Sequence, residues 1–164
     1  MSPLHNVQLL SSATVPQHKV RESRLRKVSR TTRRSYRLFV IGYVVMPEHV
    51  HLLVTEPGRA TLARAIQSLK QSVSQKLNSH HGHLWQARYY DFSVFTPKKR
   101  VEKLKYIHRN PVHRGLVARA EDWPWSSYRH YALGEVGTVQ IESPVAAWKR
   151  RQVGTQNVLV LPEV

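Results

Sequence analysis

The chain has 164 residues, 41% of them hydrophobic, and 26 Lys and Arg against 10 Asp and Glu give a net charge of +16. This length and apolar content exclude a disordered chain, and the lack of Cys excludes disulfides and thiolate metal sites. No apolar run or leader in the sequence predicts a membrane or secretory segment. The charge predicts a polyanionic partner, most commonly nucleic acid, although a ribosomal-type structural protein or a solvated basic surface has the same composition. We expect a cytoplasmic protein.

The first 37 residues give the weakest structural signal. Residues 1–18 show no clear period and contain two Pro, which predicts a poorly ordered start. Basic residues then dominate residues 19–37, including Arg33, Arg34 and Arg37. Because like charges at this density repel one another, the run is either a disordered arm or a helix held by packing or bound phosphate. We treat residues 1–32 as an atypical basic N-terminal segment.

Two apolar runs follow. Residues 38–46, LFVIGYVVM, predict a strand buried on both faces, and residues 49–54, HVHLLV, predict a second strand beside it. Residues 61–79 change to helical spacing, with Thr61 as a plausible N-cap. A third strand is predicted over residues 89–95.

A second helix is predicted to begin at Thr96-Pro97 and to end near Asn110, because Pro111 follows. The aromatic residues 123–131 are expected to pack back on the sheet, and residues 134–164 to form a variable tail. This mixture of strands and helices predicts an α+β fold on an antiparallel sheet.

His49 and His51 are candidate metal ligands. Residues i and i+2 of a strand point to the same face, so the two imidazoles can bind one divalent cation. The triplet alone is a weak signal, since two unrelated histidines are the commoner explanation in a chain with ten. The apolar strands around the pair favour a rigid site.

The second helix carries a candidate nucleophile. Glu102, Tyr106 and Asn110 share one face, so Tyr106 can attack a phosphate while Asn110 or Glu102 reaches a metal. A phenol, with a pKa of about 10, needs a nearby cation, which Lys103, Lys105 and Arg109 supply as positive potential. The alternative, a tyrosine at the edge of the core, is favoured by the spacing alone.

Residues 84–92, LWQARYYDF, mix aromatic rings with Arg88. Such a segment either stacks unpaired bases or forms a strand with core aromatics, and the sequence supports both interpretations equally.

Four segments together resemble one known family. Residues 43–54 (YVVMPEHVHLLV), 85–92 (WQARYYDF), 101–117 (VEKLKYIHRNPVHRGLV) and 122–131 (DWPWSSYRHY) resemble the HUH single-tyrosine transposases of the smallest insertion sequences, most closely the REP-associated group. The resemblance covers residues 33–133 as one domain. It implies a ferredoxin-like antiparallel sheet with helices packed on one face, a homodimer associated with the nucleoid, and hairpin-forming single-stranded DNA as substrate.

The resemblance also implies roles for individual residues. His49, His51 and Asn110 correspond to the ligands of Mg²⁺ or Mn²⁺, and Tyr106 to the nucleophile that forms a 5′-phosphotyrosine before strands are rejoined. Glu102 corresponds to no family role, and Arg33, Arg34, Arg37, Arg88, Lys103, Lys105 and Arg109 are candidate DNA-binding residues.

One feature departs from the family, which begins with an apolar strand and a helix. Residues 1–32 do not match that pattern, and loss of a central strand would expose a sheet edge and disable the enzyme. A non-catalytic nucleic-acid-binding remnant and a hydrolytic metal nuclease are therefore alternative predictions.

Overall fold

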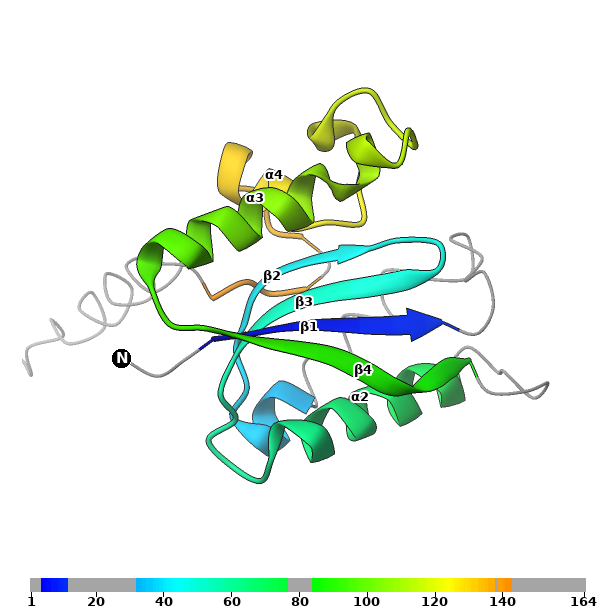
Figure 1. Cartoon of the computed structure of the whole chain (residues 1–164), viewed down its shortest axis with the longest axis vertical. Helices are drawn as coiled ribbons and strands as arrows, with labels where there is room; N and C mark the ends of the chain where they lie inside the picture. Colours follow the sequence, from blue (N-terminus) through cyan, green and yellow to red (C-terminus); the bar gives the residue numbers. More distant parts are fainter. Residues whose placement is uncertain (1–3, 12–31, 77–83, 138, 143–164) are drawn as a thin grey trace, which may run out of the picture.

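The computed structural model describes residues 4–11, 32–76, 84–137 and 139–142. An antiparallel sheet of β1 (Leu4–Ser11), β2 (Val40–Val45), β3 (His49–Thr55) and β4 (Trp85–Val94), in the order β2-β3-β1-β4, forms the centre (Figure 1). The helices are α2 (Leu62–Lys76), α3 (Pro97–His113) and α4 (Tyr128–Leu133), with a 3₁₀ turn, η2 (Ala120–Asp122). The strand order, with β1 and β3 inside, confirms the predicted ferredoxin-like α+β class.

The N-terminal strand β1 corrects the prediction of a poorly ordered start. It pairs with β3 on one side and β4 on the other, so that Gln8 lies opposite both His51 and Tyr90. Its Val7 and Leu9 are buried in the core, while polar residues alternate with them. The central strand is therefore present. Residues 12–31, which hold most of the basic run, lie outside the described part of the chain.

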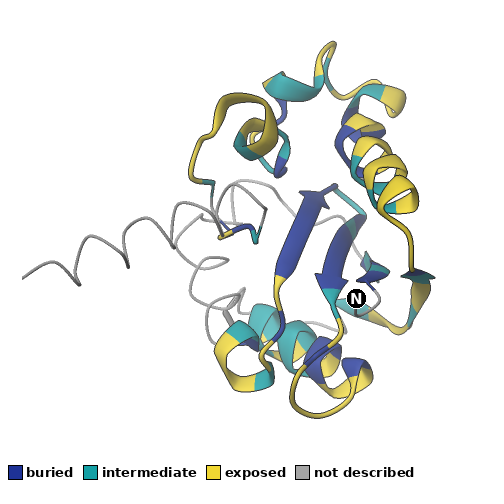
Figure 2. Ribbon diagram, turned by 90° about the vertical axis from the view of Figure 1, so that its left-hand side faces the viewer, coloured by how far each residue is buried: buried dark blue, intermediate teal, exposed yellow. Residues whose placement is uncertain are grey.

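The helices cover both faces of the sheet rather than one. On one face, Leu52 and Val54 of β3 pack with Leu62 and Ile66 of α2. On the other, the intervening Leu53 packs with Ile107 of α3. Figure 1 shows α2 and α3 on opposite sides of the sheet, and Figure 2 shows buried strands between the helical layers. Because β2 and β3 are apolar on both faces, both faces need a cover.

The helix starts follow the sequence, but one helix end does not. Thr61 Oγ1 accepts a hydrogen bond from the Arg64 N–H (3.3 Å), and Thr96 Oγ1 accepts one from the Lys99 N–H (3.2 Å). The second helix continues through buried Pro111 to His113 instead of ending at residue 110. A proline this close to the end removes only one hydrogen bond.

The chain after α3 returns to the sheet, as the aromatic segment predicts. Trp123 Nε1 donates to the Val45 carbonyl (3.1 Å), and the Tyr43 N–H donates to Ser127 Oγ (2.9 Å). Beyond α4, Val139 and Ile141 are buried in the core on the α2 side. The first part of the expected tail is therefore packed, and residues 143–164 lie outside the described residues.

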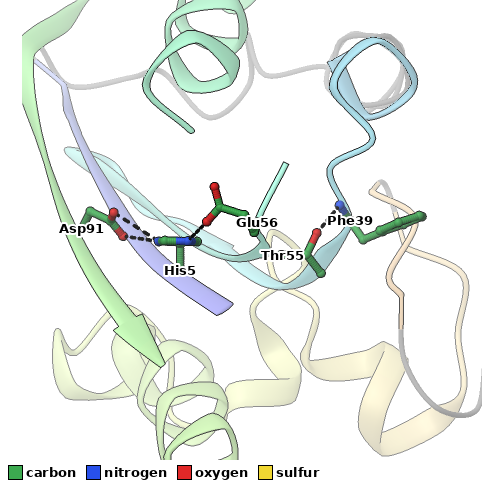
Figure 3. Close-up of polar contacts among 5 residues, drawn as sticks. All are labelled: His5, Phe39, Thr55, Glu56 and Asp91. Carbon is green, nitrogen blue, oxygen red and sulfur yellow. Dashed lines mark hydrogen bonds and ion pairs between the residues drawn. The ribbon is translucent and has the colours of Figure 1, made fainter. Parts of the chain in front are cut away.

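A histidine between two carboxylates joins three segments at one end of the sheet (Figure 3). His5 of β1 lies with Nδ1 3.2 Å from both carboxylate oxygens of Asp91 on β4, and its Nε2 pairs with Glu56, which follows β3. The His5 side chain is nearly buried, whereas both carboxylates are partly exposed. This arrangement ties β1 to both neighbouring strands.

Replacing His5 by alanine is expected to lower the free energy of unfolding by about 1–3 kcal/mol, because Glu56 and Asp91 lose their shared partner. Urea unfolding of the two proteins would measure the change. Arg129→Ala, which breaks the exposed pair with Glu135, is the matched control and should change stability by less than about 1 kcal/mol. Equal losses in the two variants would show that the His5 cluster contributes no more than a surface pair.

Candidate active site

His49 and His51 project from β3 toward the face that α3 covers. Their ring centroids are 4.8 Å apart, with the rings nearly perpendicular, and both side chains are buried. Alternation along the strand explains why Val50 points to the other face. The apolar residues of β2 and β3 hold this pair in place.

Tyr106 of α3 completes the constellation. Its ring centroid lies 5.6 Å from that of His51 in an edge-on arrangement, and 48% of the residue is exposed. The phenol therefore borders both the imidazole pair and the solvent, where a polymeric substrate can reach it. The structure thus brings Tyr106 next to His51, one of the two histidines that it was expected to face.

Burial favours the neutral form of both imidazoles. Desolvation lowers the pKa of His51 to about 4, assisted by His49 and by the positive charge of Lys103. Desolvation also lowers the pKa of His49, with Glu48 opposing the shift and Arg114 adding to it. At neutral pH each ring therefore keeps a nitrogen lone pair free for a metal.

The nitrogen atoms fit a bound cation. His49 Nε2 and His51 Nδ1 are buried and have no hydrogen-bond partner among the described residues. An unpaired buried polar atom costs about 1–3 kcal/mol, so a ligand that occupies these atoms removes a penalty. Within the same residues, no group of three His, Cys, Asp or Glu could hold a metal. Asn110, the predicted third ligand, is buried one turn beyond Tyr106.

Comparison with known proteins matches the sequence to one family. The family model for IS200-like transposases matches residues 11–110. The chain belongs to the IS200-like transposase family. It contains no described helix that is long and apolar enough to span a membrane.

Individual relatives carry the more specific family name. An Escherichia coli REP-associated tyrosine transposase is 28% identical over 88 residues, which are 53% of this chain and 52% of that protein. A Haemophilus influenzae protein provisionally named a REP-associated tyrosine transposase is 26% identical over 124 residues, or 68% of this chain and 70% of that one. A solved structure of a REP-associated tyrosine transposase bound to a REP hairpin shares the fold, with a TM-score of 0.70 over 87% of both chains at 21% identity.

Close packing of α3 on β2 positions Tyr106 over the sheet. The end of the Leu104 side chain of α3 packs directly over Gly42 of β2, where a Cβ would lie less than 3.0 Å from Leu104 Cδ2. One turn further on, His108 Nε2 lies 2.8 Å from Ser127 Oγ, which also accepts the Tyr43 N–H. These contacts fix the height and rotation of α3 over the sheet.

An ion pair at the other end of α3 reaches the histidine strand. Arg114, just beyond the helix, pairs with Glu48, the residue before His49. Both side chains are largely exposed, so the pair contributes orientation more than stability. The sequence reasoning did not identify this pair, because the two residues lie in separate segments.

The candidate cations of α3 divide between two surfaces. Lys103 Nζ lies 5.6 Å from the Tyr106 ring centroid, which places its positive charge at the active site. Lys105 and Arg109 are exposed, and their helical positions point away from the sheet. Glu102 pairs with Lys99 at 3.0 Å, so its expected reach to a metal has no support in these contacts.

The predicted arginines do not gather around Tyr106. Residues 32–36 are helical and lie beside α2, on the far side of the sheet from α3 (Figure 1). Arg33, Arg34 and Arg37 therefore belong to a separate surface, where Arg33 donates to Gln140 Oε1 (3.1 Å). Arg88 is exposed on β4, two residues from Tyr90 on the α3 side.

Acid is expected to destabilise the fold through its buried histidines. Burial lowers the pKa of His108 from 6.5 to about 4. Between these pH values the unfolded chain binds a proton at this histidine and the folded chain does not. The free energy of unfolding is then highest above pH 6.5. It decreases as the pH falls toward 4, by about 3 kcal/mol for this histidine. Urea unfolding in EDTA at several pH values tests this, and His108→Gln should reduce the dependence, leaving the part that comes from His49 and His51. A wild-type stability that stays constant from pH 7 to pH 5 would contradict the argument.

Proposed function

We propose that this chain cleaves and rejoins single-stranded DNA through a 5′-phosphotyrosine intermediate on Tyr106. The observation that carries the proposal is the contact between Tyr106 and His51, with ring centroids 5.6 Å apart. A half-exposed phenol beside two neutral, co-facial imidazoles suits a nucleophile next to a metal-binding pair. The names of the relatives as tyrosine transposases support the same chemistry.

His49, His51 and Asn110 are the residues that would hold Mg²⁺ or Mn²⁺. The free nitrogen atoms of the two imidazoles and the buried amide one turn from Tyr106 support this assignment. When bound, the cation supplies Lewis-acid polarisation of the scissile phosphate. An amide oxygen suits Mg²⁺ and Mn²⁺, whereas imidazole binds the later first-row divalent metals more tightly.

In the proposed reaction, Tyr106 Oη gives up its proton and attacks the phosphorus atom. A bond between Oη and phosphorus forms while the bond between phosphorus and the 3′ oxygen breaks, and that oxygen leaves as a free 3′-OH after taking a proton. Lys103, with Nζ 5.6 Å from the Tyr106 ring centroid, supplies a positive charge that can bind the scissile phosphate next to the nucleophile. Because the step replaces one phosphodiester bond by another, a second 3′-OH can attack the phosphotyrosine and rejoin strands without ATP.

The proposed substrate is single-stranded DNA that forms hairpins, by analogy with the solved relative bound to a REP hairpin. A net charge of +16 supports a DNA partner and predicts binding that weakens steeply with salt. We place the protein at the nucleoid for the same reason. Homodimerisation is also proposed, and light scattering would test it. The contact between Tyr106 and His51 forms within one chain and does not require a dimer.

A strand-cleavage assay tests the proposal. Purified protein is incubated with 3′-labelled hairpin DNA and Mn²⁺ or Mg²⁺, with EDTA as the control, and separated on denaturing gels. We expect a labelled covalent protein–DNA adduct that requires metal, and peptide mass spectrometry should find the nucleotide on Tyr106. Cleavage that leaves a free 5′-phosphate and no adduct would identify a hydrolytic nuclease. Binding without cleavage in either metal would identify a non-catalytic remnant.

A further inference from the structure

Two large aromatic rings of β4 are exposed on the α3 side of the sheet, beside the strands that carry the histidines. Helix α3 packs mainly on β2 and β3, while β1 and β4 continue the same face. On β4, Tyr90 is 65% and Phe92 55% exposed. Large exposed rings on a strand next to a catalytic constellation are typical of a binding surface rather than of a core.

The strand register aligns these rings with the histidines. One row across the sheet runs from His51 through Gln8 to Tyr90. The next row runs from Leu53 through Asn6 to Phe92. With about 4.8 Å between neighbouring strands, Tyr90 lies about 10 Å from His51 along its row. The side chains of each row share the α3 face, because Leu4, Leu53 and Val94 pack there.

A single cation connects the rings to the nucleophile. Lys103 Nζ lies 5.0 Å from the Phe92 ring centroid and 5.6 Å from that of Tyr106. Arg88 is exposed two residues from Tyr90 and points to the same face. Aromatic rings beside positive charges match a polyanion with flat bases, which makes single-stranded DNA a better fit than an apolar protein surface or a membrane.

The carboxamides of β1 complete this surface. Asn6 Oδ1 is buried and has no hydrogen-bond partner among the described residues, and Gln8 is partly exposed between His51 and Tyr90. A carboxamide offers both a donor and an acceptor, which is the pattern that reads the edges of nucleobases. An unused acceptor beside exposed rings points to a base as the missing partner.

We infer that Asn6, Gln8, Tyr90 and Phe92 form a subsite, the β1–β4 subsite, for unpaired bases adjacent to the phosphate that Tyr106 attacks. Tyr90 and Phe92 stack on the bases, while Asn6 and Gln8 form hydrogen bonds with the base edges. This inference rests on the proposed function and adds to it the residues that select the cleavage site. Base selection would then lie in the protein, next to the chemistry.

Binding of designed hairpins in a cleavage-deficient background tests the β1–β4 subsite. Full-length Tyr106→Phe protein in EDTA is titrated onto a fluorescent DNA hairpin with a short unpaired tail, and onto the same hairpin with an abasic tail. Tyr90→Ala and Phe92→Ala should each weaken binding to the first probe by about fivefold or more and leave binding to the abasic probe unchanged. Phe92→Tyr should restore binding.

Phe39→Ala, which removes another exposed ring near the β2 edge of the sheet, is the matched control and should bind both probes normally. Asn6→Ala and Gln8→Ala should change the ranking of tails that differ only in base sequence. Equal losses on the based and abasic probes, or no loss from either ring truncation, would overturn the inference. Because no cleavage is measured, this outcome is independent of whether wild-type protein forms an adduct.

Discussion

Replacing Tyr106 by phenylalanine is expected to reduce formation of the covalent protein–DNA adduct at least about 1,000-fold while hairpin binding stays within about twofold. The substitution removes only Oη, the atom that would bond to phosphorus. The ring keeps its edge-on position beside His51, and since the residue is half exposed the core is undisturbed. The measurement is adduct yield on denaturing gels, alongside fluorescence anisotropy for binding.

Tyr131→Phe is the matched control for this experiment. Tyr131 lies on α4, and its hydroxyl donates to the Ile41 carbonyl (2.6 Å), so its loss should lower stability without affecting the adduct. If Tyr106→Phe protein still cut DNA at the wild-type rate, the nucleophile would be water and the phosphotyrosine route would be wrong.

Replacing His51 by leucine is expected to move activity and stability in opposite directions. Adduct formation should fall at least about 100-fold, because one of the proposed metal ligands is lost. In EDTA, the free energy of unfolding should rise by about 1 kcal/mol, because a buried imidazole with an unpartnered Nδ1 gives way to an apolar side chain. Adduct yield against Mn²⁺ concentration and urea unfolding measure the two effects.

A loss of activity together with a gain in stability distinguishes a functional histidine from a structural one. A histidine kept for packing would lose stability on substitution, and activity would fall only with it. His113→Leu, at the exposed end of α3, is the control that should change neither quantity. A His51→Leu protein that is destabilised yet forms the adduct at the wild-type metal concentration would rule out the metal-binding assignment.

Part of the candidate-site geometry follows from local rules in the sequence. Alternation along a strand places His49 and His51 on one face, and helical spacing places Tyr106 and Asn110 one turn apart. The contact between Tyr106 and His51 was an expectation from family resemblance, because no local rule joins β3 to α3. The packing of Leu104 of α3 over Gly42 of β2 is likewise visible only in three dimensions.

The N-terminal strand shows what local reasoning missed. Polar Asn6 and Gln8 interrupt the apolar residues Val7 and Leu9, so the segment lacked the apolar density of the other strands. Their alternation was nevertheless a strand signal, with the polar side facing the histidines. Helices on both faces were missed because burial of a strand does not say which helix covers each side.

Other corrections have similar physical causes. Pro111 was expected to end the helix, but it lies in the last turn, where the loss of one hydrogen bond lowers helix stability only slightly. Val139 and Ile141 carry no periodic pattern, and only the tertiary structure reveals that they close the core on the α2 side.

The insertion of β1 between β3 and β4 has a consequence for synthesis on the ribosome. The residues made first pair with partners made much later, since Leu4 lies opposite both Thr55 and Val94. Contacts this distant along the chain close slowly, and because β1 can dock on β3 as soon as β3 is made, β1 then keeps its other edge unpaired until β4 follows. Nascent chains that stall before residue 94 would therefore present that edge to one another and aggregate.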